Sequence, residues 1–369
     1  KNYLVTIYRN FKRERLFTLL NLSGLALGLG CMLVIFKIIT YEQKFDKHHS
    51  NHDSIYRIVR ETFISTGVRY ESGVPHPMGE GLRTDFPDLE VAMTHYTSAH
   101  QIAVERDNGT IDRYDTEGGI VFSESTLFNI FDFEFIYGDP ATCLDDPSAL
   151  VLSRSRAKQF FKVEDAQLND VIGKEILLEN KVKYQVTALV EDFVETTDVP
   201  FDIFVHYKSL GEVNRHFGNG QRWQSTSSGT NCYFKAPANF DAEAFNQDTE
   251  KMVEKYYGER ALGRLHLIAQ PLSDLHYSEK YSNYNERSVS QELIFSLQMI
   301  GIFLILTAAI NFINLTTAQS IKRSKEIGIR KVSGAHRPQL ILQSNLESFL
   351  LNLVAFIIAL LLVSGLREA

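Results

Sequence analysis

Three long uncharged stretches constrain this chain more than any other feature of its sequence. They comprise 21 residues between Arg15 and Lys37, 29 between Glu292 and Lys322, and 19 between Glu347 and Arg367. Each is long enough to span, because a helix needs about 20 apolar residues to cross the hydrocarbon core of a bilayer. A cleaved signal peptide is the alternative for the first stretch, but its apolar run is longer than such peptides usually carry. The sequence therefore predicts an integral membrane protein with three helical spans.

The distribution of charge predicts how these spans are oriented. Residues 1–15 hold five Lys and Arg against one acid, and residues 322–337 hold six against one. Lys and Arg gather on the cytoplasmic side of membrane proteins, so both segments are expected inside. Residues 43–292 hold 40 of the 45 acidic residues and only 25 of the 38 basic ones. This acidic segment is expected outside, and no nucleic-acid partner is expected of it.

Within the outer segment, polar turns separate runs of alternating apolar residues that predict strands. The predicted strands cover residues 54–61, 90–96, 119–122, 131–137, 175–178, 184–190 and 201–207. Helical periodicity covers residues 153–161 and 241–257, and Asp241 is expected to cap the second helix. We therefore expect an α-helical transmembrane protein with a large α+β extracytoplasmic domain of two lobes.

The full organisation follows from these boundaries. The chain is expected to divide into a cytoplasmic amphipathic helix (1–15), a first span (16–41), an outer domain (43–287), a stalk with the second span (288–321), a cytoplasmic loop (322–340) and a third span (346–366). A stalk is expected because 29 helical residues reach about 44 Å, whereas the hydrocarbon core is about 30 Å thick. Because the sequence ends shortly after the third span, we expect it to be part of a longer chain.

Small and polar residues inside the spans predict where helices pack. Gly24 and Gly28 form a GxxxG motif in the first span, which permits another helix to approach closely. Asn311 and Asn314 lie three residues apart in the second span, where an amide facing lipid costs free energy. We expect both asparagines to face another helix, with substrate binding as the alternative.

No catalytic or cofactor-binding pattern occurs in the sequence. GxxxxGK[ST], HExxH, CxxC and GxSxG are all absent, so neither an enzyme nor a cofactor is expected. His48, His49 and His52 form the one histidine cluster, which we interpret as a solvated turn rather than a metal site. Cys143 and Cys232 are expected to be free buried thiols, although a disulfide between them is the alternative.

Residues 320–340, SIKRSKEIGIRKVSGAHRPQL, are the most informative segment. Ile327, Ile329 and Val332 stand among Lys and Arg residues, and the segment is expected to form a short helix that stops at Gly334, with Pro338 beginning the next element. An apolar ridge flanked by positive charge suits docking into a cleft of a cytoplasmic partner. Anchoring to lipid by the same face is the alternative.

Several motifs resemble one family of membrane proteins. KRSKEIGIRKVSGA between two apolar helices resembles the cytoplasmic loop of FtsX-like and MacB-like ABC transporter permeases. FDKHHSNHDSIYRIVRE after the first span and LHLIAQPLSDLHYS before the second are similar to the opening and the closing of the MacB-type periplasmic core domain. VIGKEILLENKVKYQVTALVEDF is similar to a hairpin of that domain. The resemblance covers nearly the whole chain.

The resemblance implies a coupling role for the cytoplasmic segment. By position in the motif, that role falls on Glu326, Ile327, Gly328, Arg330, Lys331, Gly334 and Ala335, and the apolar ridge adds Ile329. Val332 stands where the broader pattern has Ala. Members of the family work as two copies or two halves with a cytoplasmic ABC ATPase subunit, and they normally have a fourth span.

The function that this resemblance implies is that of a non-ATPase permease subunit. Such a subunit, in the bacterial inner membrane, uses ATP hydrolysis by its partner to export or release a drug, peptide or lipoprotein outside the membrane, in some cases with a periplasmic adaptor. Membrane lipid is a further expected contact. The alternatives are an FtsX-like regulator of a cell-wall hydrolase and a membrane-bound sensory receptor.

The predicted topology is testable by labelling with a thiol reagent that does not cross membranes. Single cysteines at Ser65 and Ser333 are placed in a chain without native cysteines, and intact cells are treated with an impermeant maleimide. Ser65→Cys is expected to react and Ser333→Cys to be protected, because the Lys and Arg asymmetry places position 333 inside. The reverse pattern would reject the topology.

Overall fold

A computed structural model describes most of the chain as two compact units. It describes all residues except 1–8, 10, 98, 99, 107, 117, 214–221, 285, 286, 335 and 366–369, and the side chains of Lys322, Arg323 and Glu326. Residues 1–43 and 291–369 form the membrane unit, and residues 44–290 form the outer unit. The chain therefore passes between the two units twice.

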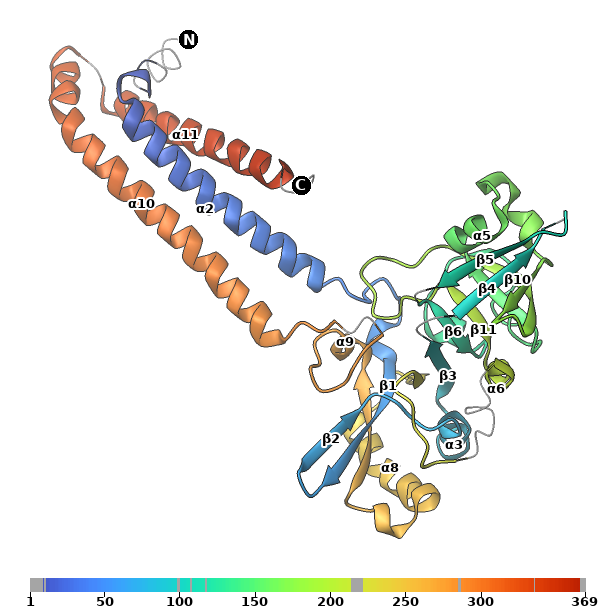
Figure 1. The fold of residues 1–369 in the computed structure, drawn as a ribbon. Helices are drawn as coiled ribbons and strands as arrows, with labels where there is room; N and C mark the ends of the chain where they lie inside the picture. The colour runs from blue at the N-terminus through green and yellow to red at the C-terminus, as the bar shows by residue number, and fades with distance from the viewer. Residues whose placement is uncertain are drawn as a thin grey trace. The chain divides into compact units, whose positions relative to one another are not determined.

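The membrane unit contains three long helices, shown in Figure 1: α2 (Arg15–Glu42), α10 (Gln291–Val332) and α11 (Arg337–Gly365). Each is long and apolar enough to cross a membrane, which confirms the three predicted spans. Helix α2 packs against both α10 and α11. Most of the amphipathic helix expected over residues 1–15 lies outside the described residues.

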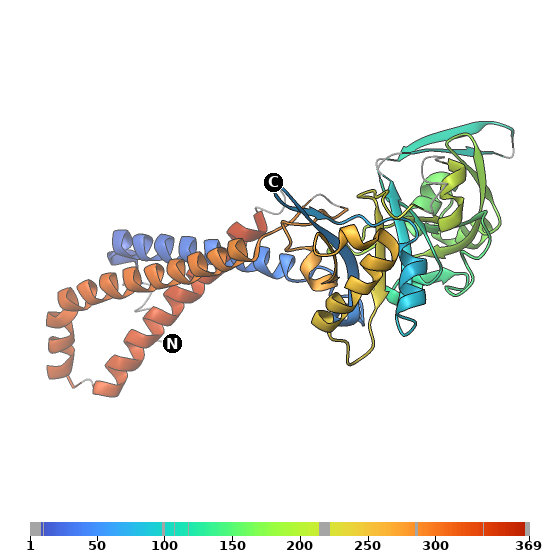
Figure 2. The ribbon, with the colours of Figure 1, turned by 90° about the horizontal axis from the view of Figure 1, so that it is seen from below.

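Helix α10 continues through the segment that was expected to form a separate short helix. Its 42 residues correspond to about 63 Å of helix, and it ends only at Val332. Figure 2 shows that its ribbon changes direction near this end. Gly334 follows with φ of 94°, a left-handed conformation that glycine adopts without strain, so the expected stop is confirmed. At its other end α10 begins at Gln291, so the extension beyond the apolar stretch is mainly cytoplasmic.

The outer unit is an α+β domain built on one mixed sheet, as Figure 1 shows. Its strands are β1 (Ile55–Ile64), β2 (Gly67–Glu71), β3 (Glu90–Thr97), β4 (His100–Glu105), β5 (Ile111–Thr116), β6 (Ile120–Ser123), β7 (Phe135–Tyr137), β8 (Ala149–Ser153), β9 (Glu175–Leu178), β10 (Val182–Val190), β11 (Ile203–His206), β12 (Thr230–Lys235) and β13 (Leu265–Pro271). Its helices are α3 (Met78–Asp85), α4 (Leu127–Ile130), α5 (Arg154–Phe161), α6 (Leu210–Val213), α8 (Ala242–Tyr257) and α9 (Leu272–Leu275).

The sheet joins the two ends of the outer unit. Its strand order is β13-β1-β12-β3-β6-β11-β8-β10-β9-β4-β5, with β2 paired to β1 and β7 paired to β10. The first strand, β1, runs antiparallel to the last, β13, from Tyr56 opposite Pro271 to Thr62 opposite Leu265. Most pairs are antiparallel, but β8 with β10 and β6 with β11 are parallel.

Both faces of the central sheet carry a hydrophobic core. In β8, Ala149 and Val151 belong to one core cluster and Leu150 and Leu152 to another, because successive side chains of a strand point to opposite faces. Helix α4 contributes to the first cluster and α5 to the second. A third cluster joins α3 and α8 to β1, β3, β12 and β13. The two expected lobes therefore share one continuous sheet.

Most predicted elements of the outer unit are confirmed, and several strands were missed. Strand β9 matches its predicted range, and Asp241 caps α8 by accepting hydrogen bonds from the amides of Glu243 and Ala244 at 2.9 and 3.2 Å. The strand predicted over 131–137 is shorter, since only Phe135–Tyr137 pairs. Strands β2, β4, β5, β8 and β12 were not predicted. Cys143 and Cys232 are free and buried, as expected.

We predict that residues 44–290 fold without the membrane unit. The only tryptophan, Trp223, stacks on Tyr256 of α8 with 4.0 Å between the ring centroids, so its fluorescence reports on this unit. Urea should produce one cooperative transition. Phe122→Ala, at a fully buried site, should lower the free energy of unfolding by about 3–5 kcal/mol. Phe63→Ala, at a side chain that is 47% exposed, is the matched control and should change it by about 0.5 kcal/mol or less. Equal effects of the two substitutions, or the absence of a transition, would contradict this prediction.

Candidate coupling site at the cytoplasmic ends of the membrane helices

The expected apolar ridge at the end of α10 is divided between two faces. Ile327 and Arg330, three residues apart and so on one helical face, line a cavity inside the membrane unit. Ile329 and Val332, also three residues apart, are 61% and 91% exposed. The most exposed aliphatic side chains of the segment are therefore those of Ile329 and Val332, while Ile327 is 43% exposed beside the cavity. Lys331 is exposed as well, but it lies around the helix from Ile329.

Arg330 links the end of α10 to α11. Its Nη1 donates a hydrogen bond to Oε1 of Gln343 at 3.1 Å. A similar contact lies further along α10, where Nε2 of Gln319 donates to Oε2 of Glu14 at 2.8 Å. These contacts attach the inner face of α10 to the rest of the membrane unit. The outer face of residues 327–332 is left available for a partner.

The cavity beneath the segment is small and polar. It has a volume of about 120 Å³ and is lined largely by hydroxyl and amide side chains, among them those of Thr18, Asn21, Thr316, Gln343, Ser344 and Ser348. Asn21 is only 3% exposed, and its Oδ1 accepts no hydrogen bond from the described residues. Because a buried amide oxygen is costly to leave unsatisfied, a polar cavity of this size suits ordered water.

The predicted packing motif of α2 contacts α10 within the chain. A Cβ atom built on Gly28 would lie 2.7 Å from Cβ of Ala308, and one built on Gly24 would lie 2.8 Å from Nδ2 of Asn311. Both distances are shorter than the separation that real Cβ atoms keep from other heavy atoms. Gly24 and Gly28 therefore permit the two helices to approach, and Asn311 faces another helix, as expected.

Four further site residues were expected: Asn314, Glu326, Gly328 and Ala335. Asn314 is exposed, as Asn311 is, and the packing role expected of it stays a prediction. Ala335 and the side chain of Glu326 lie outside the described residues. Gly328 is exposed and has open space around it.

The histidine cluster lies in a turn, as expected, but it is only partly solvated: His48 is exposed, whereas His49 is buried. His49 is 1% exposed, and burial lowers its pKa to about 3, so the imidazole is neutral at pH 7. Possible ligand atoms of Asp46, His48 and His49 lie within 4.8 Å of one another. However, the amide of Asp132 donates to Nδ1 of His49 at 3.1 Å, which leaves the proton on Nε2 and no free lone pair on the ring. This arrangement does not fit a metal ion.

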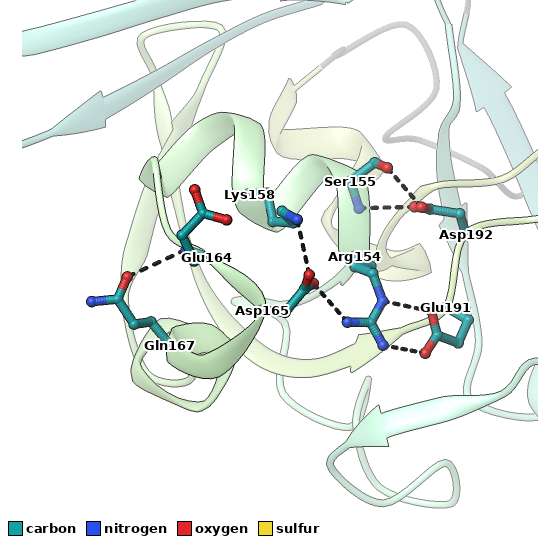
Figure 3. A network of polar contacts seen from close by, with 8 residues as sticks. All are labelled: Arg154, Ser155, Lys158, Glu164, Asp165, Gln167, Glu191 and Asp192. Atoms are coloured by element: carbon teal, nitrogen blue, oxygen red, sulfur yellow. Dashed lines mark hydrogen bonds and ion pairs between the residues drawn. The ribbon is translucent and has the colours of Figure 1, made fainter.

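A network of polar contacts around the start of α5 was not predicted from the sequence. Figure 3 shows Arg154 at the start of α5 between Glu191 and Asp165, and Ser155 directed at Asp192. The amide and hydroxyl of Ser155 donate to Asp192 at 2.8 and 2.6 Å. No spacing in the sequence indicated these pairs, because their members belong to elements that are distant in the chain.

The three apolar spans and the outer α+β domain match the family models of a membrane subunit associated with ABC-type transporters. The profile of the MacB-like periplasmic core domain matches residues 18–252, and that of the FtsX-like permease C-terminal domain matches residues 298–368. The chain belongs to the MacB/FtsX-like permease family. It is a multi-pass inner-membrane protein whose outer unit is periplasmic.

Solved structures with a similar fold are distant in sequence. A domain from Porphyromonas gingivalis, assigned to a permease, is 14% identical with a TM-score of 0.48, and the match covers 68% of this chain and 99% of that domain. The periplasmic region of MacB from Actinobacillus actinomycetemcomitans is 12% identical with a TM-score of 0.39, and the match covers 60% and 90%. No curated protein sequence matches the chain.

The close approach of α2 and α10 predicts unequal effects of two Gly→Ala substitutions. Gly28→Ala should destabilise the membrane unit by about 1–3 kcal/mol, because the new methyl group overlaps Ala308. Gly30→Ala should be neutral or mildly stabilising, since its Cβ would lie 4.0 Å from Ala359. The temperature at which half of the detergent-solubilised protein precipitates measures both. Adding Ala308→Gly should restore the stability of Gly28→Ala; a failure of this rescue would show that the two positions are not in contact.

Proposed function

We propose that this chain is the non-ATPase permease subunit of an ABC system and that it binds a cytoplasmic ABC ATPase through the end of α10. The outer face of that segment, with Ile329 and Val332, is the docking surface, and Lys331 lies at its rim. ATP-driven closure of the partner moves the segment, and the outer unit performs work on a drug, peptide or lipoprotein client in the periplasm. A second permease copy completes the assembly.

The exposure of Ile329 and Val332 is the observation that supports this proposal most directly. Two aliphatic side chains that are 61% and 91% exposed stand in a segment otherwise rich in Lys and Arg. A helix that presents aliphatic anchors with charge around them is a common means of docking into a groove. The anchors are fixed in place because Arg330, between them, is hydrogen-bonded to α11.

The composition of the spans favours work outside the bilayer over transport through it. The apolar stretches contain no charged residue, and the polar cavity of the membrane unit holds only about 120 Å³. Charged or strongly polar groups normally line a solute pathway across a membrane. A mechanical role, in which the membrane helices transmit movement, therefore suits this chain better than a channel.

Substitutions at the docking surface test the proposal. Ile329→Asp and Val332→Asp should each abolish co-purification with an ABC ATPase encoded beside this chain, because a carboxylate buried in the contact costs several kcal/mol. Ile329→Leu retains the apolar contact and should preserve binding. Lys331→Ala should weaken binding by about 1 kcal/mol or less. Membrane insertion should be unchanged in all four variants.

The lipid-anchor alternative gives the opposite pattern. If Ile329→Asp and Val332→Asp retain the ATPase while Lys331→Ala reduces binding of the detergent-solubilised chain to anionic vesicles, the segment is an anchor and the proposed docking is wrong. Ile327→Asp distinguishes the two faces of the helix. Because Ile327 lines the cavity, this substitution should lower the stability of the membrane unit as well as any binding.

A further inference from the structure

The two connections of the outer unit to the membrane helices meet in one buried cluster. One connection follows α2, which ends at Glu42, and the other precedes α10, which begins at Gln291. The rings of Phe45 from the first connection and His276 from the segment leading to the second are stacked, with centroids 3.6 Å apart and 16° between their planes. Residues 231 positions apart are thus in direct contact.

Hydrogen bonds reinforce this stacking. The hydroxyl of Thr197 donates to Oδ1 of Asp46 at 2.6 Å, and the amide of Asp198 donates to the same carboxylate at 3.2 Å. Oδ2 of Asp198 lies 3.1 Å from Nδ1 of His276. Asp46, Asp198 and His276 are all at most 3% exposed. We call Phe45, Asp46, Thr197, Asp198 and His276 the root cluster.

The second connection is fixed to the cluster up to its last residues. The amide of Val289 donates to the carbonyl of His276 at 3.0 Å, one residue before the outer unit ends at Ser290. The side-chain amide of Asn283 donates to Oδ1 of Asp198 at 3.1 Å. The segment between His276 and α10 is therefore tied to the carboxylate of Asp198, whose backbone amide in turn donates to Asp46 of the first connection.

The root cluster is also attached to the sheet. Thr197 and Asp198 belong to the segment that follows β10, and the start of that segment is held by α5, where Arg154 binds Glu191 and Ser155 binds Asp192 (Figure 3). Residues 191–198 thus connect the root cluster to β10 and α5, which lie in the part of the sheet distant from β1.

Attraction between charged groups does not explain why these residues are buried together. Burial, with the neighbouring carboxylate of Asp198, raises the pKa of Asp46 to about 7, although the hydrogen bond from Thr197 opposes this shift. A carboxyl group in such a site is expensive to keep unless its hydrogen bonds hold a particular geometry. Asp46 also has a left-handed backbone, with φ of 54°, a conformation that aspartate adopts more readily than most residues other than glycine.

From these contacts we propose that the root cluster is a positioning element that makes the two membrane connections move as one body. This proposal rests on the proposed function, because the cluster would convey movement of the membrane helices. Displacement of either α2 or α10 then reaches the outer unit at a single place rather than at two independent ends.

Distance measurements between spin labels on the two connections test this role in the full-length chain. Nitroxide labels are placed at the exposed positions Lys44 and Ser288 after Cys31→Ala; the remaining cysteines, Cys143 and Cys232, are buried. Pulsed electron paramagnetic resonance should give a single narrow distance distribution. Asp46→Ala and His276→Ala should each broaden it at least twofold, because each removes one side of the clamp.

Matched variants separate the clamp from general effects of substitution. Asp53→Ala and His52→Ala remove the same residue types a few positions away, where the Asp53 side chain is 88% exposed, and should leave the distribution unchanged. Asp46→Asn keeps an oxygen that accepts from Thr197 and should retain the narrow distribution. His276→Phe keeps the stacking on Phe45 but loses the contact with Asp198, and should broaden it less than His276→Ala.

The outcomes distinguish the cluster from the proposed function. A broad distribution in the unsubstituted chain, or an unchanged one in Asp46→Ala and His276→Ala with native Trp223 fluorescence, would overturn the role of the cluster. In complex with the ATPase, the distance between the labels should be the same with and without a non-hydrolysable ATP analogue. A change would mean that the connections separate, which would also overturn this inference. If no ATPase binds, the proposed function fails while the distance result without partner stands.

Discussion

The antiparallel pairing of β1 with β13 is the interaction on which the rest of the outer unit depends. In sequence order these are the first and the last strands of the sheet. Their pairing runs from Tyr56 opposite Pro271 to Thr62 opposite Leu265. Buried Arg57 reinforces the pairing, because its Nη2 donates to Oε1 of Gln270 at 2.7 Å. The pairing of these strands also places the two connections to the membrane close together. A buried arginine is stable there because its donors are satisfied.

Close contacts also hold neighbouring segments together at both ends of the membrane helices. At the cytoplasmic end, Arg330 fixes the inner face of α10 to Gln343 and leaves Ile329 and Val332 exposed. At the periplasmic end, Phe45 and His276 bring the two connections together. Between them, Gly28 permits α2 to lie directly on α10. Each of these contacts joins two different helices or connections.

The parts of this structure that were predicted from the sequence depend on local composition. Uncharged runs must form spans because the bilayer offers no other stable arrangement, and Asp241 caps α8 through atoms two and three residues away. The root cluster was not predicted, since Asp46 and Asp198 are 152 positions apart. Strand β8 was missed because both of its faces are buried, so it shows no alternation. The two faces of residues 327–332 could not be told apart from the sequence, because the inner face is defined by its contact with α11.

The position of β1 also has a consequence for the biogenesis of this protein. Residues 55–64 leave the ribosome about 200 residues before β13 does, which at 5–20 residues per second is a delay of roughly 10–40 seconds. During that interval β1 has no β13 to pair with, although α2 is already available to the membrane. The sheet is therefore completed only after nearly all of the periplasmic domain has been translocated. Until β13 is made, the backbone groups of β1 that pair with it have no partner in the sheet.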